Sequence, residues 1–396
     1  MKQKICVVGL GYIGLPTASL LANKGYRVHG VDIVQSTVDT INRGEIHILE
    51  PELDSFVKSA VGSGNLKADI QPTEADIFIV AVPTPFHNGF VPNVDYIISA
   101  TKSIAPYVKD ENIIILESTS PVGTTDEMER VLKEEGIDTS SLYIAHCPER
   151  VLPGQIMKEL VENDRIVGGI TSEATKKTVD FYKTFVKGEV LSTDARTAEM
   201  AKLTENSFRD TNIAFANELS ILCDKFGIDV WELIKLTNRH PRVNVLKPGA
   251  GVGGHCIAVD PWFIVHAGGE DAKMIRTARE VNTYKTEWVI EKIKNEALKF
   301  ENKYNKKVKI ACMGLAFKPN IDDLRESPAL YITRQLISDG FAVLAVEPNI
   351  KSFREFEIVE YKEALEKADI VIFLVGHNEF KNLNMKTGLD FCGVTN

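Results

Sequence analysis

The stretch Lys4-Ile-Cys-Val-Val-Gly-Leu-Gly-Tyr-Ile-Gly14 joins a short apolar run to the glycine pattern G-x-G-x-x-G. Residues 4–8 predict a β-strand, residues 15–24 predict a helix, and residues 26–31 predict a second strand that ends at Asp32. A strand, this glycine pattern, a helix, a second strand and an acidic residue, in that order, form the context that a dinucleotide-binding fingerprint requires. The sequence therefore predicts an α/β fold that begins with a Rossmann domain.

The three glycines and the acidic residue each have a predicted task in binding a dinucleotide. Gly9, Gly11 and Gly14 are expected to permit a tight turn and the close approach of a pyrophosphate to the backbone. The N-terminus of the helix supplies amide donors and a favourable dipole. Asp32 is expected to accept hydrogen bonds from the adenosine ribose and to repel a 2′-phosphate, which favours NAD over NADP. The alternative is a glycine-rich turn in an unrelated α/β domain.

The doubly wound pattern continues with three more predicted strands, at residues 77–82, 112–117 and 142–145. Because ligands of an open parallel sheet bind at the carboxyl ends of its strands, the polar residues that follow are candidates for one site. Each of them alone is explained more simply as a turn or cap residue, but three such strand ends beside a fingerprint favour a ligand site. These residues are Thr84, Thr119 and Glu149.

Length, charge and cysteine spacing limit the classes of protein that fit. A chain of 396 residues is too long for one ordinary core, so two or three domains are expected. The net charge of −9 argues against a nucleic-acid partner, and no stretch reaches the roughly 20 apolar residues of a membrane span. The six cysteines form no C-x-x-C pair and no metal-ligand pattern with the histidines, so no metal site is expected. With no signal peptide visible, a reducing cytoplasm is expected.

A long helical segment follows the strands. Residues 196–226 contain no proline or glycine, which predicts a helix of about 45 Å that links domains and forms the spine of a dimer. Lys202, Asn206 and Arg209 would share one polar stripe on this helix. The stripe either faces a ligand or is an ordinary solvated helix face.

The last part of the chain half-repeats the first. Residues 309–316 repeat the pattern at the start of the chain, and residues 341–346 end at Glu347 as the second strand ends at Asp32. This repetition predicts a second, smaller Rossmann-like unit. Because the unit lacks G-x-G-x-x-G, no second dinucleotide is expected there.

Basic residues gather in two loops of this acidic chain. His240 and Arg242 lie in one of them, where they either meet a phosphate or belong to an ordinary charged turn. The first loop of the second Rossmann-like unit carries Phe317, Lys318 and Arg325. Two cationic groups at a strand end suit a nucleotide diphosphate.

Cys256 is the candidate nucleophile. It follows four glycines, which would let backbone amides approach a reacting carbonyl closely, and Asp260 stands four residues later. Cysteine is nucleophilic as its thiolate, and a helix beginning near Cys256 would favour that form. The alternative is a buried structural cysteine after a glycine-rich turn.

Taken together, these residues resemble the UDP-sugar 6-dehydrogenase family, the group of UDP-glucose and UDP-mannuronate dehydrogenases. The resemblance covers essentially the whole chain. It implies an NAD-binding Rossmann domain at residues 1–192, a central helical domain for dimerisation and catalysis at 193–301, and a C-terminal UDP-binding Rossmann-like domain at 302–396. The motifs that carry it are Gly9-Leu-Gly-Tyr-Ile-Gly-Leu-Pro16, Ser118-Thr-Ser-Pro-Val-Gly-Thr124, Lys202 with Asn206, Gly253-Gly-His-Cys256 with Asp260, and Phe317-Lys318 with Arg325.

The resemblance implies a four-electron oxidation of a UDP-sugar at C6, from the primary alcohol to the carboxylate. NAD is the cofactor, and Cys256 carries a thiohemiacetal and then a thioester. The segments at 148–154 and 238–244 are similar to those of members that act on UDP-N-acetyl-D-mannosamine. UDP-glucose enzymes usually carry serine at the position of His255, so the resemblance implies that His255 serves specificity or packing.

The family's functional residues carry over position by position. The resemblance assigns to catalysis Cys256, Lys202, Asn206, Asp260, Glu149 and Thr119. It assigns to NAD Gly9, Gly11, Tyr12, Ile13, Gly14, Asp32, Thr84, Thr119 and Arg325. It assigns to the UDP-N-acetyl-sugar Arg150, Val151, Lys202, Asn206, Arg209, His240, Arg242, Gly253, Phe317 and Lys318. It also implies a homodimer through the central helices, in which the basic loop serves the neighbour's site.

Three other functions compete with this one. UDP-N-acetylglucosamine or UDP-glucose could be the substrate, because the preference rests on loop shape. A non-catalytic NAD and UDP-sugar sensor has no need of a nucleophile, so Cys256 with Lys202 and Asp260 argues against it. A two-electron 3-hydroxyacid-type dehydrogenase shares a Rossmann unit and a helical domain but leaves the third segment unexplained.

Overall fold

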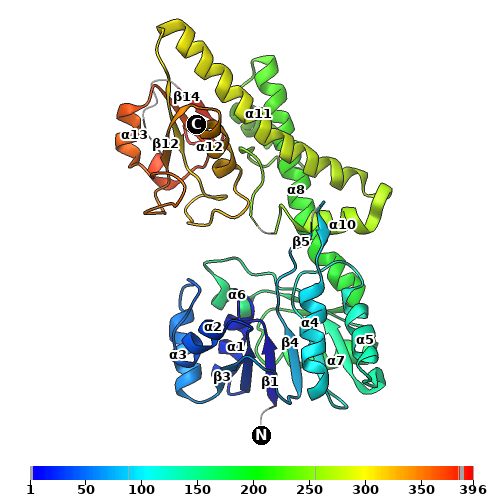
Figure 1. Ribbon diagram of the computed structural model, residues 1–396. Helices are drawn as coiled ribbons and strands as arrows, with labels where there is room; N and C mark the ends of the chain where they lie inside the picture. The colour runs from blue at the N-terminus through cyan, green and yellow to red at the C-terminus, as the bar shows by residue number, and fades with distance from the viewer. Residues whose placement is uncertain (1–2, 88, 255, 382, 384–387, 396) are drawn as a thin grey trace. The chain divides into compact units, whose positions relative to one another are not determined.

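The computed structural model describes residues 3–87, 89–254, 256–381, 383 and 388–395. The chain forms two compact units, residues 1–204 and residues 205–396, and the boundary falls inside one long helix. Each unit contains a β-sheet of its own with helices around it (Figure 1). The division into three domains at residues 192 and 301 stays a prediction.

The first unit is built on an eight-stranded sheet in the order β10-β9-β8-β7-β4-β1-β2-β3. The strands run parallel from β3 to β8, whereas β9 and β10 are parallel to each other and antiparallel to β8. The bounds are β1 (Lys4–Val8), β2 (Arg27–Val31), β3 (Leu66–Asp69), β4 (Ile77–Val80), β7 (Ile113–Leu116), β8 (Tyr143–His146), β9 (Arg165–Gly169) and β10 (Val190–Asp194). A separate hairpin pairs β5 (Phe86–His87) with β6 (Val91–Pro92).

Helices cover both faces of this sheet, as a doubly wound fold requires. Alternate residues of a strand point to opposite faces, and Ile5 and Val7 lie in one core cluster while Cys6 and Val8 lie in another. The first cluster packs α1 (Gly14–Asn23), α2 (Gln35–Asn42), α3 (Leu53–Gly62), α6 (Ile156–Glu162) and α7 (Ser172–Tyr182). The second packs α4 (Asp95–Ile104) and α5 (Thr124–Glu134). The predicted Rossmann fold is confirmed.

The helical segment lies between the two sheets in the chain. It consists of α8 (Ala195–Phe226), α9 (Val230–Thr237), α10 (Asp260–Gly268) and α11 (Lys273–Tyr304). The prediction of one uninterrupted helix at 196–226 is confirmed by α8. A buried polar layer joins α8 to α11, in which the Arg279 guanidinium contacts the Asp210 carboxylate at 2.6 Å. Among the described residues, none of the helices combines the length and the apolar composition of a membrane span.

The second sheet is parallel, with the order β12-β11-β13-β14. Its strands are β11 (Lys309–Met313), β12 (Ala342–Val346), β13 (Ile370–Phe373) and β14 (Gly388–Asp390). One face packs against α11 and α12 (Pro328–Ser338), and the other packs against α13 (Tyr361–Lys367). This confirms the predicted Rossmann-like unit at the end of the chain. Short 3-10 turns occupy Ala105–Tyr107, Thr139–Ser141, Gly269–Asp271 and Asn378–Phe380.

Candidate active site

The strand ends of the first unit gather the predicted polar residues at one edge of the sheet. β1, β4, β7 and β8 are parallel and in register, so the loops that follow them leave from the same edge. Thr84 and Thr119 lie in two of these loops, and the Thr84 hydroxyl donates a hydrogen bond to the Thr119 carbonyl at 2.6 Å. Glu149 lies in the loop after β8. This is the edge at which open parallel sheets generally bind their ligands.

The geometry of the three glycines fits a dinucleotide. Gly9 has φ +93°, and a Cβ there would come within 2.5 Å of the Ala81 carbonyl oxygen. A Cβ at Gly14 would lie 1.7 Å from the Gly9 carbonyl oxygen, so the helix can approach the strand only with glycine at this position. At Gly11 no described atom lies within 4 Å of the Cβ position, which leaves backbone open to a pyrophosphate.

Asp32 is held beside this glycine loop at the end of β2. One carboxylate oxygen accepts from the Leu10 amide at 3.1 Å, and the other accepts from the Val34 amide at 2.9 Å. The residue is half-buried, so part of its surface faces solvent. Of the other predicted NAD residues in this loop, Tyr12 is exposed and Ile13 is half-buried.

A buried cluster of charged groups lies under the strand ends, and sequence reasoning missed most of it. The Glu149 carboxylate accepts from Arg165 Nη1 at 2.7 Å and from the Arg150 amide at 2.6 Å. Glu117, the residue after β7, accepts from the Tyr182 hydroxyl at 2.7 Å. Burial, followed by the negative charge of Glu149, raises the pKa of Glu117 to about 7. The site therefore rests on an acid that can hold a proton near neutral pH.

Replacing Glu117 with glutamine is expected to reduce the pH dependence of stability. Folding raises the pKa of Glu117 from 4.5 to about 7, so the folded state binds the proton of this acid more tightly than the unfolded state does. The contribution of the protonated acid to folding stability is therefore lost as the pH rises from about 4.5 through about 7. Between about pH 5 and about pH 8, the wild-type melting temperature should therefore fall more than that of Glu117→Gln. An equally steep fall in the variant would contradict this. Glu135→Gln, at the exposed position that directly follows α5, is the matched control.

Cys147, next to this cluster, behaves as a structural cysteine. It is fully buried, and burial raises the pKa of its thiol to about 12. A thiol in such surroundings is inert as a nucleophile. Cys256, in contrast, is half-buried.

In the second unit the structure brings together three of the predicted catalytic residues. The Asn206 side-chain amide on α8 donates to the Asp260 carboxylate at 2.6 Å, and both residues are buried. Asp260 is also linked to Cys256, because its amide donates to the Cys256 carbonyl at 2.8 Å. Asparagine is a poor helix former. The hydrogen bond to Asp260 explains why Asn206 nevertheless lies inside α8.

The expectation that a helix starts near Cys256 needs correction. α10 begins at Asp260, four residues later, and the amides of Val259 and Asp260 donate to the Cys256 carbonyl. Asp260 itself occupies the positive end of the helix, where a carboxylate is favoured. His255, next to the cysteine, lies outside the described residues.

The glycine-rich loop before Cys256 is anchored on buried polar side chains of the helices. The Gly249 amide donates to the Asn217 side-chain oxygen at 2.9 Å, and the Thr286 hydroxyl donates to the Ala250 carbonyl at 3.0 Å. A Cβ at Gly251, where φ is +145°, would lie 2.2 Å from the Thr286 hydroxyl oxygen. Asn217 and Thr286 could not be recognised as loop anchors from the sequence, since both look like ordinary helix residues.

Phe317 and Arg325 belong to a loop that packs directly on this glycine-rich segment. A Cβ at Gly253 would lie 2.9 Å from the Phe317 Cβ, and one at Gly254 would lie 2.9 Å from the Phe317 ring. The Gly254 amide donates to the Arg325 carbonyl at 3.2 Å, and the Arg325 guanidinium pairs with Asp323 at 2.6 Å. A cavity of about 640 Å³ opens beside the two segments, lined among others by Lys247, Gly249, Gly251, Phe317, Asn320 and Lys381.

The remaining predicted residues lie nearer the surface. On α8, Lys202 is half-buried and Arg209 is exposed. The basic loop after α9 exposes both His240 and Arg242, and Lys318 is also exposed. In the loop after β8, Arg150 and Val151 are half-buried, and Arg150 Nη1 donates to the Asp164 carbonyl at 3.2 Å.

Comparison with known proteins accounts for nearly the whole chain. The UDP-glucose/GDP-mannose dehydrogenase family matches in three parts: its NAD binding domain at residues 3–186, its central domain at 196–284 and its UDP binding domain at 311–392. The UDP-N-acetyl-D-mannosamine dehydrogenase of Campylobacter jejuni is 56% identical, over 98% of this chain and 99% of that protein. The NDP-N-acetyl-D-galactosaminuronic acid dehydrogenase of Ralstonia solanacearum is 53% identical, over 96% and 92%.

The fold of the chain is also similar to that of a solved dehydrogenase structure. The UDP-D-ManNAc dehydrogenase of Pyrococcus horikoshii superposes with a TM-score of 0.89 at 38% identity, covering 99% of this chain and 96% of that one. Matches of this extent, together with the dinucleotide geometry of the first unit, show that the chain belongs to the UDP-glucose/GDP-mannose dehydrogenase family and is an NAD-dependent oxidoreductase.

Proposed function

We propose that the protein oxidises UDP-N-acetyl-D-mannosamine at C6 to UDP-N-acetyl-D-mannosaminuronate, with two NAD per acid formed. The pair formed by Asn206 and Asp260, bonded to the loop that presents a half-buried Cys256, is the observation that carries this proposal. A primary alcohol becomes an acid only after the aldehyde has taken up oxygen from water, and a cysteine provides a covalent route for that step. The similarity to relatives named for mannosamine supports this sugar.

Cys256 is the centre of the proposed mechanism. Bound NAD supplies the hydride acceptor for both oxidation steps. The Cys256 thiolate adds to C6 of the aldehyde and forms a C–S bond, giving a thiohemiacetal. Loss of a hydride from C6 to the bound acceptor, and of the hydroxyl proton to a neighbouring base or water, leaves a thioester. Water then attacks the thioester, the C–S bond breaks, and the acid leaves with the thiol regenerated.

The neighbouring polar groups handle protons and charge. Lys202 and Asn206 are proposed to stabilise the oxyanion that develops at C6. Asp260, fixed by Asn206, is proposed to orient Lys202 or to help activate water. Glu149 and Thr119 are the other candidates for handling water. A reducing compartment such as the cytoplasm suits this chemistry, since Cys256 must stay a thiol.

The UDP part is proposed to bind at the loop that carries Phe317 and Lys318. The cavity beside it offers an aromatic face at Phe317 and cationic side chains at Lys247 and Lys381. Such groups suit a pyrimidine nucleotide with its two phosphates. The exposed guanidinium groups of Arg209 and Arg242 are proposed to meet the sugar nucleotide as well.

A panel of sugar nucleotides tests the substrate assignment, because relatives of nearly equal identity carry different sugar names. The protein is incubated with NAD and, separately, with the UDP forms of N-acetylmannosamine, N-acetylglucosamine, N-acetylgalactosamine and glucose. Mass spectrometry should show the acid, one oxygen heavier and two hydrogens lighter, from the mannosamine compound at the highest rate. Acid from another sugar with none from mannosamine would reject the assignment.

A homodimer through α8 is proposed, as the family resemblance implies. Phe208, Phe215 and Leu222 recur every seven residues and therefore lie along one stripe of the helix. Their exposed fractions are 68%, 60% and 40%, which is unusual for large apolar side chains that share one face. A second copy of the chain would cover this stripe.

Phe215→Glu is expected to weaken the dimer about 100-fold or more, because a charge replaces a central apolar contact. Light scattering after size-exclusion chromatography should give the mass of a monomer for the variant and of a dimer for the wild type. The exposed Lys351→Glu is the control, since it changes charge away from the helix. A Phe215→Glu protein that remains dimeric at low micromolar concentration would refute the interface.

A further inference from the structure

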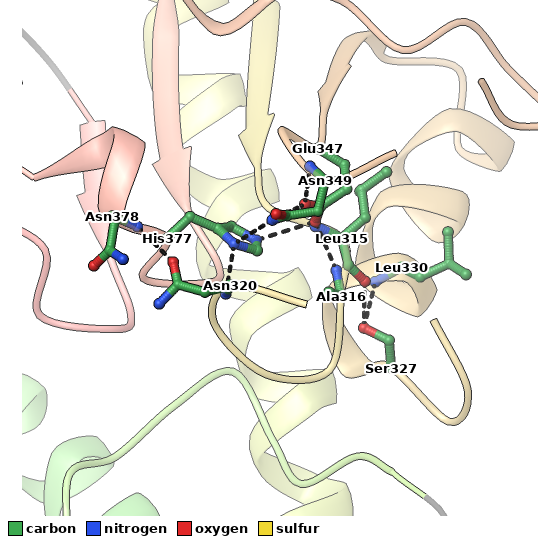
Figure 2. A network of polar contacts seen from close by, with 9 residues as sticks. All are labelled: Leu315, Ala316, Asn320, Ser327, Leu330, Glu347, Asn349, His377 and Asn378. Carbon is green, nitrogen blue, oxygen red and sulfur yellow. Dashed lines mark hydrogen bonds and ion pairs between the residues drawn. The ribbon is translucent and has the colours of Figure 1, made fainter. Parts of the chain in front are cut away.

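Glu347 ends β12 as Asp32 ends β2, but its surroundings differ. Asp32 is half-buried, whereas Glu347 is 2% exposed. One Glu347 oxygen accepts from the amides of Leu315 and Ala316 at 2.8 and 2.9 Å (Figure 2). In the second Rossmann-like unit this acid therefore binds the backbone of the loop that follows β11. Burial alone would raise the pKa of Glu347. The hydrogen bonds that its carboxylate accepts, first among them the one from His377, instead lower this pKa to about 2.

His377 completes this network from the loop after β13, and its ring is fully buried. Nδ1 receives a hydrogen bond from the Asn320 amide at 3.0 Å, and the Asn349 side-chain amide lies 3.1 Å from the same nitrogen. Because a backbone amide can only donate, Nδ1 carries no proton. The proton is therefore on Nε2, which donates to Glu347 at 3.1 Å. The ring is the neutral Nε2–H tautomer, with Phe380 packed edge-on against it.

The two residues hold the loop after β11 at both of its ends. Glu347 binds the amides at its start, and His377 binds the Asn320 amide five residues after Leu315 (Figure 2). Phe317 and Lys318 lie between these anchors. The Phe317 ring in turn packs on the glycine segment that leads to Cys256.

We infer that His377 is a positioning residue for nucleotide binding: as the neutral Nε2–H tautomer paired with Glu347, it fixes the Asn320 amide and so holds Phe317 and Lys318 in place. The inference rests on the proposed role of Phe317 and Lys318 in binding UDP. The polar contacts of the His377 ring are with Asn320, Asn349 and Glu347, none of which is assigned to the cofactor or the chemical step. Its loss should act on affinity for the nucleotide rather than on the chemical step.

Two substitutions separate the two hydrogen bonds of the ring. Asparagine can place its Oδ1 near the position of Nδ1, so His377→Asn keeps the acceptor for the Asn320 amide. Glutamine can place its Nε2 near the ring Nε2, so His377→Gln keeps the donor to Glu347 and loses that acceptor. The inference predicts UDP affinity about 10-fold weaker in His377→Gln and within about threefold of wild type in His377→Asn.

Isothermal titration of the full chain with UDP, and separately with NADH, measures these affinities. NADH affinity should be unchanged in both variants, and KM for the sugar nucleotide should rise in His377→Gln with kcat nearly constant. Asn349→Ala removes a side-chain amide that contacts both the His377 ring and the Glu347 carboxylate at 3.1 Å. It is the milder variant if His377→Gln fails to fold, and about threefold weaker UDP binding is expected from it.

Equal UDP affinity in wild type and His377→Gln would overturn the inference, as would equal losses in the asparagine and glutamine variants. A parallel loss of NADH affinity would also overturn it, because it would indicate a general structural defect. A wild-type protein that binds no UDP would reject the proposed function and the inference with it. If the wild-type protein oxidises its UDP-sugar and His377→Gln binds UDP as tightly as the wild type does, the inference is rejected and the proposed function stands.

Discussion

Cys256→Ser is expected to lower the rate of acid formation about 1000-fold or more. A serine hydroxyl is scarcely ionised at neutral pH, so addition to the aldehyde, and with it the thioester route, is lost. The measurement is NADH formation at saturating sugar nucleotide, with the acid quantified by mass spectrometry. Unchanged affinities for NADH and UDP in the variant would show that only the chemical step is affected. Acid formation at the wild-type rate would refute the covalent mechanism.

Arg165→Met is expected to destabilise the first unit by about 3–5 kcal/mol. The Arg165 side chain is 2% exposed and the Glu149 side chain 6%, so removing the guanidinium leaves a carboxylate buried without its counter-charge. Urea denaturation followed by circular dichroism should show a clearly lower midpoint for the variant.

Arg130→Met is the matched control for this prediction. Arg130 also contacts carboxylates, those of Glu127 and Glu134, but all of them lie at the protein surface. Surface ion pairs contribute little to stability, so this variant should unfold close to the wild type. If Arg165→Met were no less stable than Arg130→Met, the buried pair would not have the structural role assigned to it.

The regular elements could be predicted from the sequence because their signals are local. The apolar run at 4–8 matches β1, and the prediction of a helix at 196–226 differs from α8 by one residue. The dinucleotide loop was equally predictable, since its glycines are required by contacts within a few residues and across one strand. In the first sheet, β3, β9 and β10 were not predicted, and β9 in particular ends in two glycines that make it look like a turn.

The pairs that organise the candidate site could not be predicted from composition or spacing. Asn206 meets Asp260 across 54 residues, and Glu347 meets His377 across 30. Such contacts depend on where the sheets and helices place their ends, which no local pattern encodes. The family resemblance supplied Asn206 and Asp260, whereas the supporting residues beneath them emerged only from the packing.

The most direct test of the central claim is the number of NADH molecules formed for each molecule of acid, with UDP-N-acetyl-D-mannosamine as substrate and the wild-type protein. A four-electron oxidation through Cys256 predicts two NADH for each acid, with no aldehyde accumulating in solution. One NADH for each product, or no NADH from this substrate, would contradict the account.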